Sequence, residues 1–66
     1  MRLIVNGKPE CLNRVATLTD LLVQYDLAPV RVAVEVNREL VPRGDFDRTP
    51  LREGDEVEIV TFVGGG

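Results

Sequence analysis

The sequence predicts an α+β domain in which one helix packs across a mixed sheet of four to five strands. Three patterns in the 66 residues lead to this expectation. An Asn-Gly pair separates two short extended segments near the start. A stretch with helical spacing of apolar residues follows. Two later segments alternate apolar and polar residues with the period of two that is typical of strands. The composition, 44% hydrophobic and 29% charged, is that of a globular domain.

The first 12 residues predict a β-hairpin. Residues 1–5 are the first strand, and Asn6-Gly7 favours a type I′ turn, because both central positions of that turn need a positive φ. Residues 8–12 are then the returning strand. Pro9 has no N–H to donate to a ladder, so this strand is expected at an edge of the sheet.

Residues 17–25 predict one amphipathic helix. Thr17 and Asp20 have the spacing of a capping box, with Asp in place of the usual Glu. Apolar residues follow on one helical face. We expect the helix to end before Pro29, since proline disfavours helical conformation in the residue that precedes it. The residues on the apolar face are Leu18, Leu21, Leu22 and Tyr25.

The second half of the chain predicts two longer strands. Residues 30–36 place valines at every second position, and residues 56–63 alternate in the same way. Between them, Leu40-Val41 forms a short extended piece before Pro42. Residues 43–53 are interpreted as irregular, with Phe46 and Leu51 pointing inward. The expected inward residues of the last strand are Val57, Ile59, Thr61 and Val63.

This order of elements is that of the β-grasp, or ubiquitin-like, fold, whose sheet takes both terminal strands in its middle. Periodicity supports one helix on one sheet but does not establish strand order. We expect residues 1–63 to form the domain and residues 64–66 a flexible glycine tail, because glycine loses the most backbone entropy on ordering.

The composition excludes several classes of function. The chain has no histidine and one cysteine, Cys11, so Ser–His and Cys–His catalytic sets and a structural zinc site are excluded. The net charge of −3 argues against nucleic acid. No apolar run is long enough for a membrane span, and a single thiol fits a reducing cytoplasm. We expect a protein that is not an enzyme on its own and binds no cofactor.

Two features of the last seven residues are candidates for function. Gly64 and Gly65 can thread into a narrow channel of a partner and deliver the α-carboxylate of Gly66 for activation. The alternative is a frayed end or a cloning remnant. Val60 and Phe62 alternate with the expected core residues and are candidates for partner docking. The alternative is that they are core residues covered by the segment in the 40s.

The other candidates are weaker. Cys11 is expected to be a small buried or strand residue. Gly54 is expected to be a turn residue with positive φ. Four acidic residues around Gly54 either form a solvated face or attract a basic partner electrostatically. They are Glu53, Asp55, Glu56 and Glu58.

Over essentially its whole length the chain resembles the ThiS family, the sulfur carrier proteins of bacterial thiamine biosynthesis. The segments that carry the resemblance are residues 3–7 (LIVNG), Thr17-Leu18 with Leu21-Leu22, residues 34–37 (VEVN) through 41–43 (VPR), residues 51–60 (LREGDEVEIV) and the Gly-Gly end.

The resemblance implies a β-grasp fold and a set of partners. An E1-like adenylyltransferase of the ThiF type would use ATP and magnesium to adenylate the carboxylate of Gly66. Sulfur from a cysteine desulfurase would replace AMP and leave a thiocarboxylate. Thiazole synthase (ThiG) would take that sulfur to build the thiazole ring. ATP and magnesium would belong to the activating enzyme.

Two alternatives remain open at this point. A MoaD-like subunit of molybdopterin synthase or a tRNA-thiolation carrier would share the fold and the Gly-Gly end but deliver sulfur elsewhere. A ubiquitin-like interaction module would have the same fold with inert glycines. Copurified partners and the chemical state of the terminus separate these possibilities.

Overall fold

The computed structural model describes residues 1–62; the expected tail, Gly64–Gly66, and Val63 lie outside the described residues. In chain order the elements are β1 (Arg2–Val5), β2 (Lys8–Cys11), α1 (Leu18–Gln24), the 3-10 helix η1 (Pro29–Arg31), β3 (Val32–Val36), β4 (Glu39–Val41), the 3-10 helix η2 (Arg43–Arg48) and β5 (Glu56–Thr61). None of the helices described is long and apolar enough to cross a membrane.

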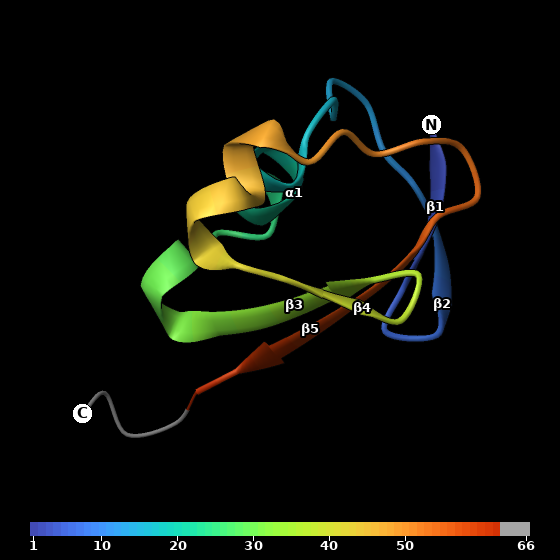
Figure 1. Cartoon of the computed structure of the whole chain (residues 1–66). Helices are drawn as coiled ribbons and strands as arrows, with labels where there is room; N and C mark the ends of the chain where they lie inside the picture. Colours follow the sequence, from blue (N-terminus) through green and yellow to red (C-terminus); the bar gives the residue numbers. More distant parts are fainter. Residues whose placement is uncertain (63–66) are drawn as a thin grey trace.

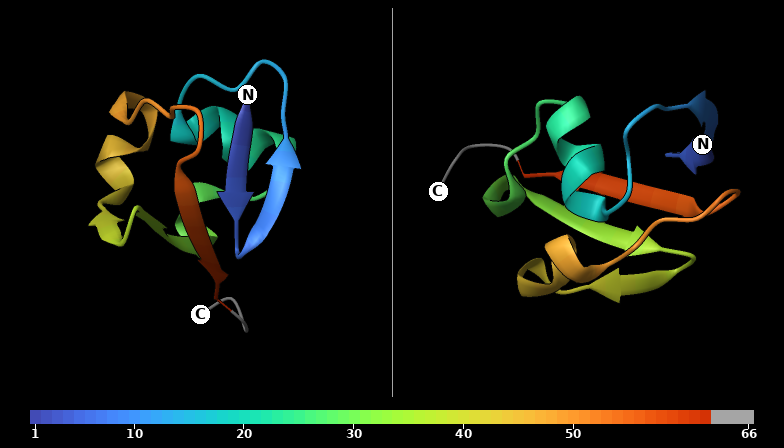
Figure 2. Two further views of the ribbon diagram at one scale, coloured as in Figure 1. Left: turned by 90° about the vertical axis from the view of Figure 1, so that its right-hand side faces the viewer. Right: turned by 90° about the horizontal axis from the view of Figure 1, so that it is seen from above.

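The sheet has the strand order β2-β1-β5-β3-β4 (Figures 1 and 2). The first and last strands lie side by side in its middle and run parallel. The pairs β1–β2, β3–β4 and β3–β5 are antiparallel. A single α-helix lies across one face of this mixed sheet (Figure 1). The prediction of an α+β β-grasp fold is confirmed, and the structure adds the strand order that periodicity does not establish.

The first hairpin has the predicted turn. Asn6 and Gly7 have φ values of 50° and 80°, as a type I′ turn requires. Pro9 lies on β2, an edge strand of the sheet, opposite Ile4 of β1. Because no further strand pairs with the outer side of β2, the N–H that Pro9 lacks costs no hydrogen bond there. The second hairpin, β3–β4, uses the same kind of turn, with Asn37 at 51° and Arg38 at 69°.

Helix α1 begins as predicted but ends earlier. The Thr17 side chain accepts from the N–H of Asp20 (3.4 Å), and the Asp20 carboxylate accepts from the N–H groups of Ala16 (2.8 Å) and Thr17 (3.0 Å). The capping box is therefore confirmed.

The helix ends before Pro29, as expected, but a Schellman motif and not the proline ends it, with Gln24 as its last residue. Asp26 adopts φ 57° and donates to the Val23 carbonyl (3.1 Å), and Leu27 donates to the Leu22 carbonyl (2.9 Å). These two bonds satisfy carbonyls of the last turn. Asp is one of the few residues other than glycine that tolerates this left-handed conformation.

Asp20 should make stability dependent on pH. Its two backbone hydrogen bonds, from Ala16 and then Thr17, hold the pKa of the carboxyl below the ordinary value of 3.8. A lowered folded-state pKa stabilises the fold above the unfolded-state pKa, and this contribution is lost as pH falls through the folded-state pKa. In urea unfolding between about pH 6 and pH 2, wild type should lose more stability than Asp20→Asn, which keeps an acceptor oxygen but carries no charge. Equal losses would show that this cap contributes nothing to acid sensitivity.

The core lies between α1 and the inner face of the sheet. Leu18, Leu21 and Leu22 of α1 are at most 1% exposed. Phe46 and Leu51 are buried as predicted, at 3% and 4%. The other buried residues are Leu3, Val5, Val15, Val32, Val34, Val57 and Ile59.

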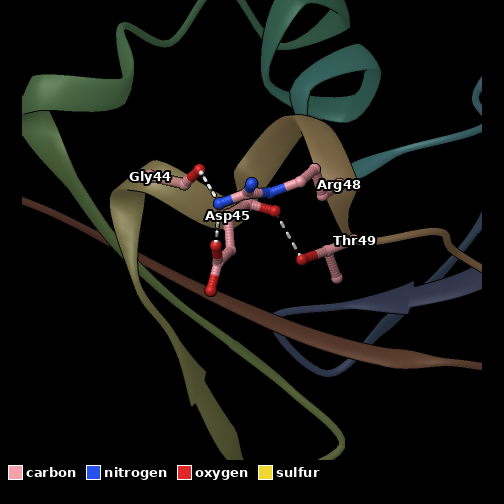
Figure 3. Close-up of polar contacts among 4 residues, drawn as sticks. All are labelled: Gly44, Asp45, Arg48 and Thr49. Atoms are coloured by element: carbon pink, nitrogen blue, oxygen red, sulfur yellow. Dashed lines mark hydrogen bonds and ion pairs between the residues drawn. The ribbon is translucent and has the colours of Figure 1, made fainter.

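The prediction that residues 43–53 are irregular is wrong for their first half. Residues 43–48 form η2, in which Arg48 donates to Asp45 Oδ1 (2.7 Å) and to the Gly44 carbonyl (3.3 Å). The Thr49 hydroxyl donates to the Asp45 carbonyl (2.7 Å; Figure 3). These polar contacts close the short helix on its outer side while Phe46 anchors it to the core.

Two residues that the alternating pattern predicted to point into the core, Val30 and Thr61, are exposed. Val30 belongs to η1, where Pro29 occupies the first helical turn, and is 62% exposed. Thr61 is in β5 but exposed. Its flank of the sheet is open because β1 pairs with β5 only as far as Val57. Both predictions are therefore wrong.

Candidate functional site

The end of β5 is the part of the described chain that precedes the glycines. β5 pairs with β3 from Val57, opposite Val36, to Thr61, opposite Val32. After the strand, the N–H of Phe62 donates to the Arg31 carbonyl (2.8 Å). The chain is therefore held to η1 up to the last described residue (Figure 1). The predicted roles of Gly64, Gly65 and Gly66 fall on residues outside the described part.

Val60 and Phe62 form an exposed apolar patch next to this end. Val60 is 59% exposed and Phe62 is 51% exposed. Val57 and Ile59, which point the other way, are buried. Val60 pairs across the sheet with Ala33, so the apolar surface continues onto β3. We call Val60, Phe62 and Ala33 the outer patch.

The alternative in which the segment of the 40s covers these side chains is wrong. η2 contacts α1 and η1 and buries Phe46 among the residues of the core. Figure 2 shows α1 and η2 together over one face of the sheet. The outer patch lies on the opposite face, because Val60 alternates with the core residues of β5. Its exposure is established, and its role in docking stays a prediction.

Two acidic side chains, Glu58 and Glu35, adjoin the outer patch, and an exposed leucine lies next to them. Glu58 of β5 lies opposite Glu35 of β3, which lies opposite Leu40 of β4. All three side chains are exposed. Two like charges directly opposite each other across a sheet repel. A basic surface that approaches this face would relieve that repulsion. The face therefore combines an apolar end, the outer patch, with an acidic region beside it.

Two of the four acidic residues noted in the sequence have structural roles. Glu53 accepts from the N–H of Arg2 (3.0 Å). Asp55 accepts from the N–H of Arg52 (2.8 Å) and from the Asn37 amide (3.0 Å). Gly54 between them has φ 85°, as predicted for a turn glycine. These contacts close the turn that leads into β5.

Neither Cys11, nor a metal-binding cluster, nor a pocket adds a reactive group next to the outer patch in the described residues. Cys11 was expected to be a small buried residue or a strand residue. It lies on β2 and is exposed. In the part of the chain that the structure describes, no three His, Cys, Asp or Glu side chains gather to hold a metal. An apolar depression of about 390 Å³ lies at the opposite end of β5. It is lined by Arg2, Leu3, Ile4, Pro9, Glu53 and Gly54.

Sequence reasoning missed the contact that Asn6 makes with β5. Asn6 accepts from the N–H of Ile59 through its Oδ1 (2.7 Å) and donates through its Nδ2 to the Ile59 carbonyl (3.2 Å). The sequence marks Asn6 only as a turn residue. A pairing across 53 residues has no local signal, so only the parallel packing of β1 on β5 reveals it.

Comparison with known proteins places the chain in a family. The model of the ThiS family matches residues 3–66. The chain belongs to the ThiS family. A crystal structure of the thiamine biosynthesis protein ThiS from Geobacter metallireducens superposes with a TM-score of 0.84 at 40% identity, covering 100% of both chains.

ThiS relatives occur both as small proteins and within longer ones. The sulfur carrier protein ThiS of Bacillus subtilis is 42% identical over 50 residues, 76% of each chain. A thiazole synthase of Magnetococcus marinus is 41% identical over all 66 residues, but the match covers only 20% of that protein. The chain thus spans about a fifth of the length of this relative.

Proposed function

We propose that this ThiS-family chain is a sulfur carrier whose reactive group is the C-terminal carboxylate of Gly66. Membership of the family, matched from residue 3 to residue 66, is the observation that carries the proposal. The sequence adds that there is no histidine and only one cysteine. The protein then acts as a cosubstrate of partner enzymes rather than as an enzyme.

The chemistry of the carrier takes place at one acyl carbon. A carboxylate oxygen of Gly66 attacks the α-phosphorus of ATP, and pyrophosphate leaves. The terminal sulfur of a persulfide made by a cysteine desulfurase attacks the acyl carbon of the adenylate, and AMP leaves. A thiol then reduces the remaining S–S bond and releases the thiocarboxylate. ATP is a substrate of the activating enzyme, which uses it with Mg²⁺, and the carrier itself binds no cofactor.

Three partners follow from this sequence of steps. An E1-like adenylyltransferase of the ThiF type activates the terminus, the desulfurase supplies sulfur, and a thiazole synthase of the ThiG type accepts it. The last assignment is supported by the thiazole synthases of Magnetococcus marinus and Paramagnetospirillum magneticum, which contain a stretch similar to the whole of this chain. The use of ATP and a thiol reductant in these steps supports a proposed cytoplasmic location.

The outer patch is the proposed docking surface for these partners. Val60 and Phe62 lie four and two residues before Gly64, so a partner that covers them brings the tail to its own active site. Aromatic residues are enriched at the centres of interfaces, and Phe62 has 51% of its surface exposed. The neighbouring Glu35 and Glu58 favour a partner surface with basic side chains around an apolar centre.

Reconstitution tests the proposal. The protein is incubated with the ThiF-type enzyme of its host, ATP, Mg²⁺, a cysteine desulfurase, cysteine and a thiol. The expected product has the mass of the protein with one oxygen replaced by sulfur, and this product requires ATP. An unchanged mass under all conditions would refute the proposal. Copurification of a molybdopterin synthase subunit in place of thiazole synthase would redirect the sulfur to another pathway.

A further inference from the structure

Asn6 completes the parallel ladder between β1 and β5 with its side chain. Its main-chain N–H donates to the Val57 carbonyl (2.9 Å), as the next residue of a parallel strand would. Its φ of 50° then turns the chain into the hairpin. The Oδ1 of Asn6 accepts the N–H of Ile59 at 2.7 Å. In a regular parallel pair the main-chain carbonyl of that residue would accept this N–H.

Asn37 uses the same device on the other flank of β5. It opens the β3–β4 turn with φ 51°, and its N–H donates to the Glu56 carbonyl (2.7 Å). Its Oδ1 accepts the N–H of Glu56 (3.0 Å). The two hairpins of the fold thus each begin with an asparagine that holds β5. Asn37 holds the beginning of the strand, and Asn6 holds the part that leads to the outer patch.

Asn6 marks the point beyond which β5 is paired on one side only. The register with β3 directs the N–H and C=O groups of Val60 toward β3, and the N–H of Phe62 donates to Arg31. On the β1 flank, the hydrogen bonds of the described residues end at Ile59 with the Asn6 amide. The last contact on this flank therefore lies one residue before Val60.

We propose that Asn6 is a positioning residue for the docking of this protein on its activating enzyme. This inference rests on the proposed function. The Asn6 amide holds Ile59 and thereby presents Val60 and Phe62 in a fixed orientation before binding. Without it, the segment from Ile59 to Phe62 is hydrogen-bonded on one side and frays from its end, as weakly paired strand ends do.

A frayed segment lowers affinity but leaves the reaction unchanged. Ordering main chain costs entropy, so a partner that binds a frayed β5 must supply that free energy from its contacts. The KM for the carrier rises. The reacting acyl carbon lies beyond the domain, and once the partner holds it the rate of adenylation is unaffected, so kcat stays constant.

The test compares Asn6→Gly with Asn37→Gly. Glycine accepts the positive φ of both positions, so each variant loses the side-chain hydrogen bonds without backbone strain, and the two share the same turn position. Steady-state adenylation by the host's ThiF-type enzyme is measured as pyrophosphate release with the carrier varied. Amide hydrogen exchange of Val60 and Phe62 is measured by NMR in the free proteins, relative to the amide of Leu21 in α1.

The expected result separates the two asparagines. Asn6→Gly raises the KM about threefold to tenfold, the size of a lost hydrogen bond, with kcat within about twofold. The same variant speeds exchange at Val60 and Phe62 by a similar factor. Asn37→Gly lowers global stability comparably and leaves the KM and the relative exchange rates at both amides at the wild-type level.

Two outcomes would overturn the inference. One is that both variants change the KM equally, which indicates a general loss of stability. The other is that exchange at Val60 and Phe62 is unaffected in Asn6→Gly. A wild-type protein that is not adenylated at all would refute the proposed function, and the exchange measurement would still decide whether Asn6 orders the end of β5.

Discussion

Deletion of Gly66 is expected to abolish sulfur loading. The deletion moves the terminal acyl carbon back by about 3.3–3.6 Å, the rise of one extended residue. Misplacement of a reacting group by about 1 Å can reduce a rate by about 10²-fold. Adenylation and thiocarboxylate formation should therefore fall by at least about 10²-fold. Pyrophosphate release and intact mass measure the two steps separately.

Two further variants make this result specific. Addition of one alanine after Gly66 displaces the carboxylate in the opposite direction and should be equally inactive. Gly44→Ala is the control, since a Cβ at Gly44 meets no atom within 4 Å and its φ is not in the left-handed range. The control should load sulfur at the wild-type rate. Loading in either tail variant at the wild-type rate would contradict the role of the terminal carboxylate.

Truncation of Phe62 is expected to produce the second largest effect. An aromatic anchor at the centre of an interface contributes about 2 kcal/mol or more, which is about 30-fold in an equilibrium constant. Phe62→Ala should therefore raise the KM of the activating enzyme for this protein by about 30-fold. Stability should change little, because Phe62 is 51% exposed.

A matched pair of valines tests whether the effect belongs to the outer patch. Val60→Ala removes an apolar side chain that is 59% exposed in β5, and Val23→Ala removes one that is 71% exposed on α1. Only the first change should weaken binding to the enzyme. If Val23→Ala weakens binding as much as Val60→Ala, or Phe62→Ala leaves the KM unchanged, the partner docks elsewhere.

The features that could be predicted from the sequence are those with local causes. The Asn6-Gly7 turn and the Thr17 capping box each depend on a few neighbouring residues, and both are confirmed. Alternation along one strand placed Val60 and Phe62 on the face opposite the core residues but left open whether the segment in the 40s covers them, and the structure shows both exposed. The glycines at 64–66 were recognised from composition and family resemblance, and their role stays a proposal.

The features that the sequence did not predict depend on contacts between distant segments. Alternation placed Thr61 in the core, but β1 stops at Val5 and leaves that flank of β5 open. It also placed Val30 in a strand, although Pro29 starts a 3-10 turn there. The role of Asn6 arises only when β1 and β5, the two ends of the domain, lie parallel in the sheet.

The mass of the protein purified from its own host shows whether Gly66 carries sulfur in the cell. Cells are grown without thiamine, so that the demand for sulfur transfer is high, and the intact protein is analysed without reducing or alkylating agents. The account predicts a species that ends at Gly66 and carries one sulfur in place of one oxygen, with the fragment masses placing it at that residue. A terminus that carries only the carboxylate under this demand, or a chain that continues past Gly66 and keeps it within a peptide bond, would contradict the account.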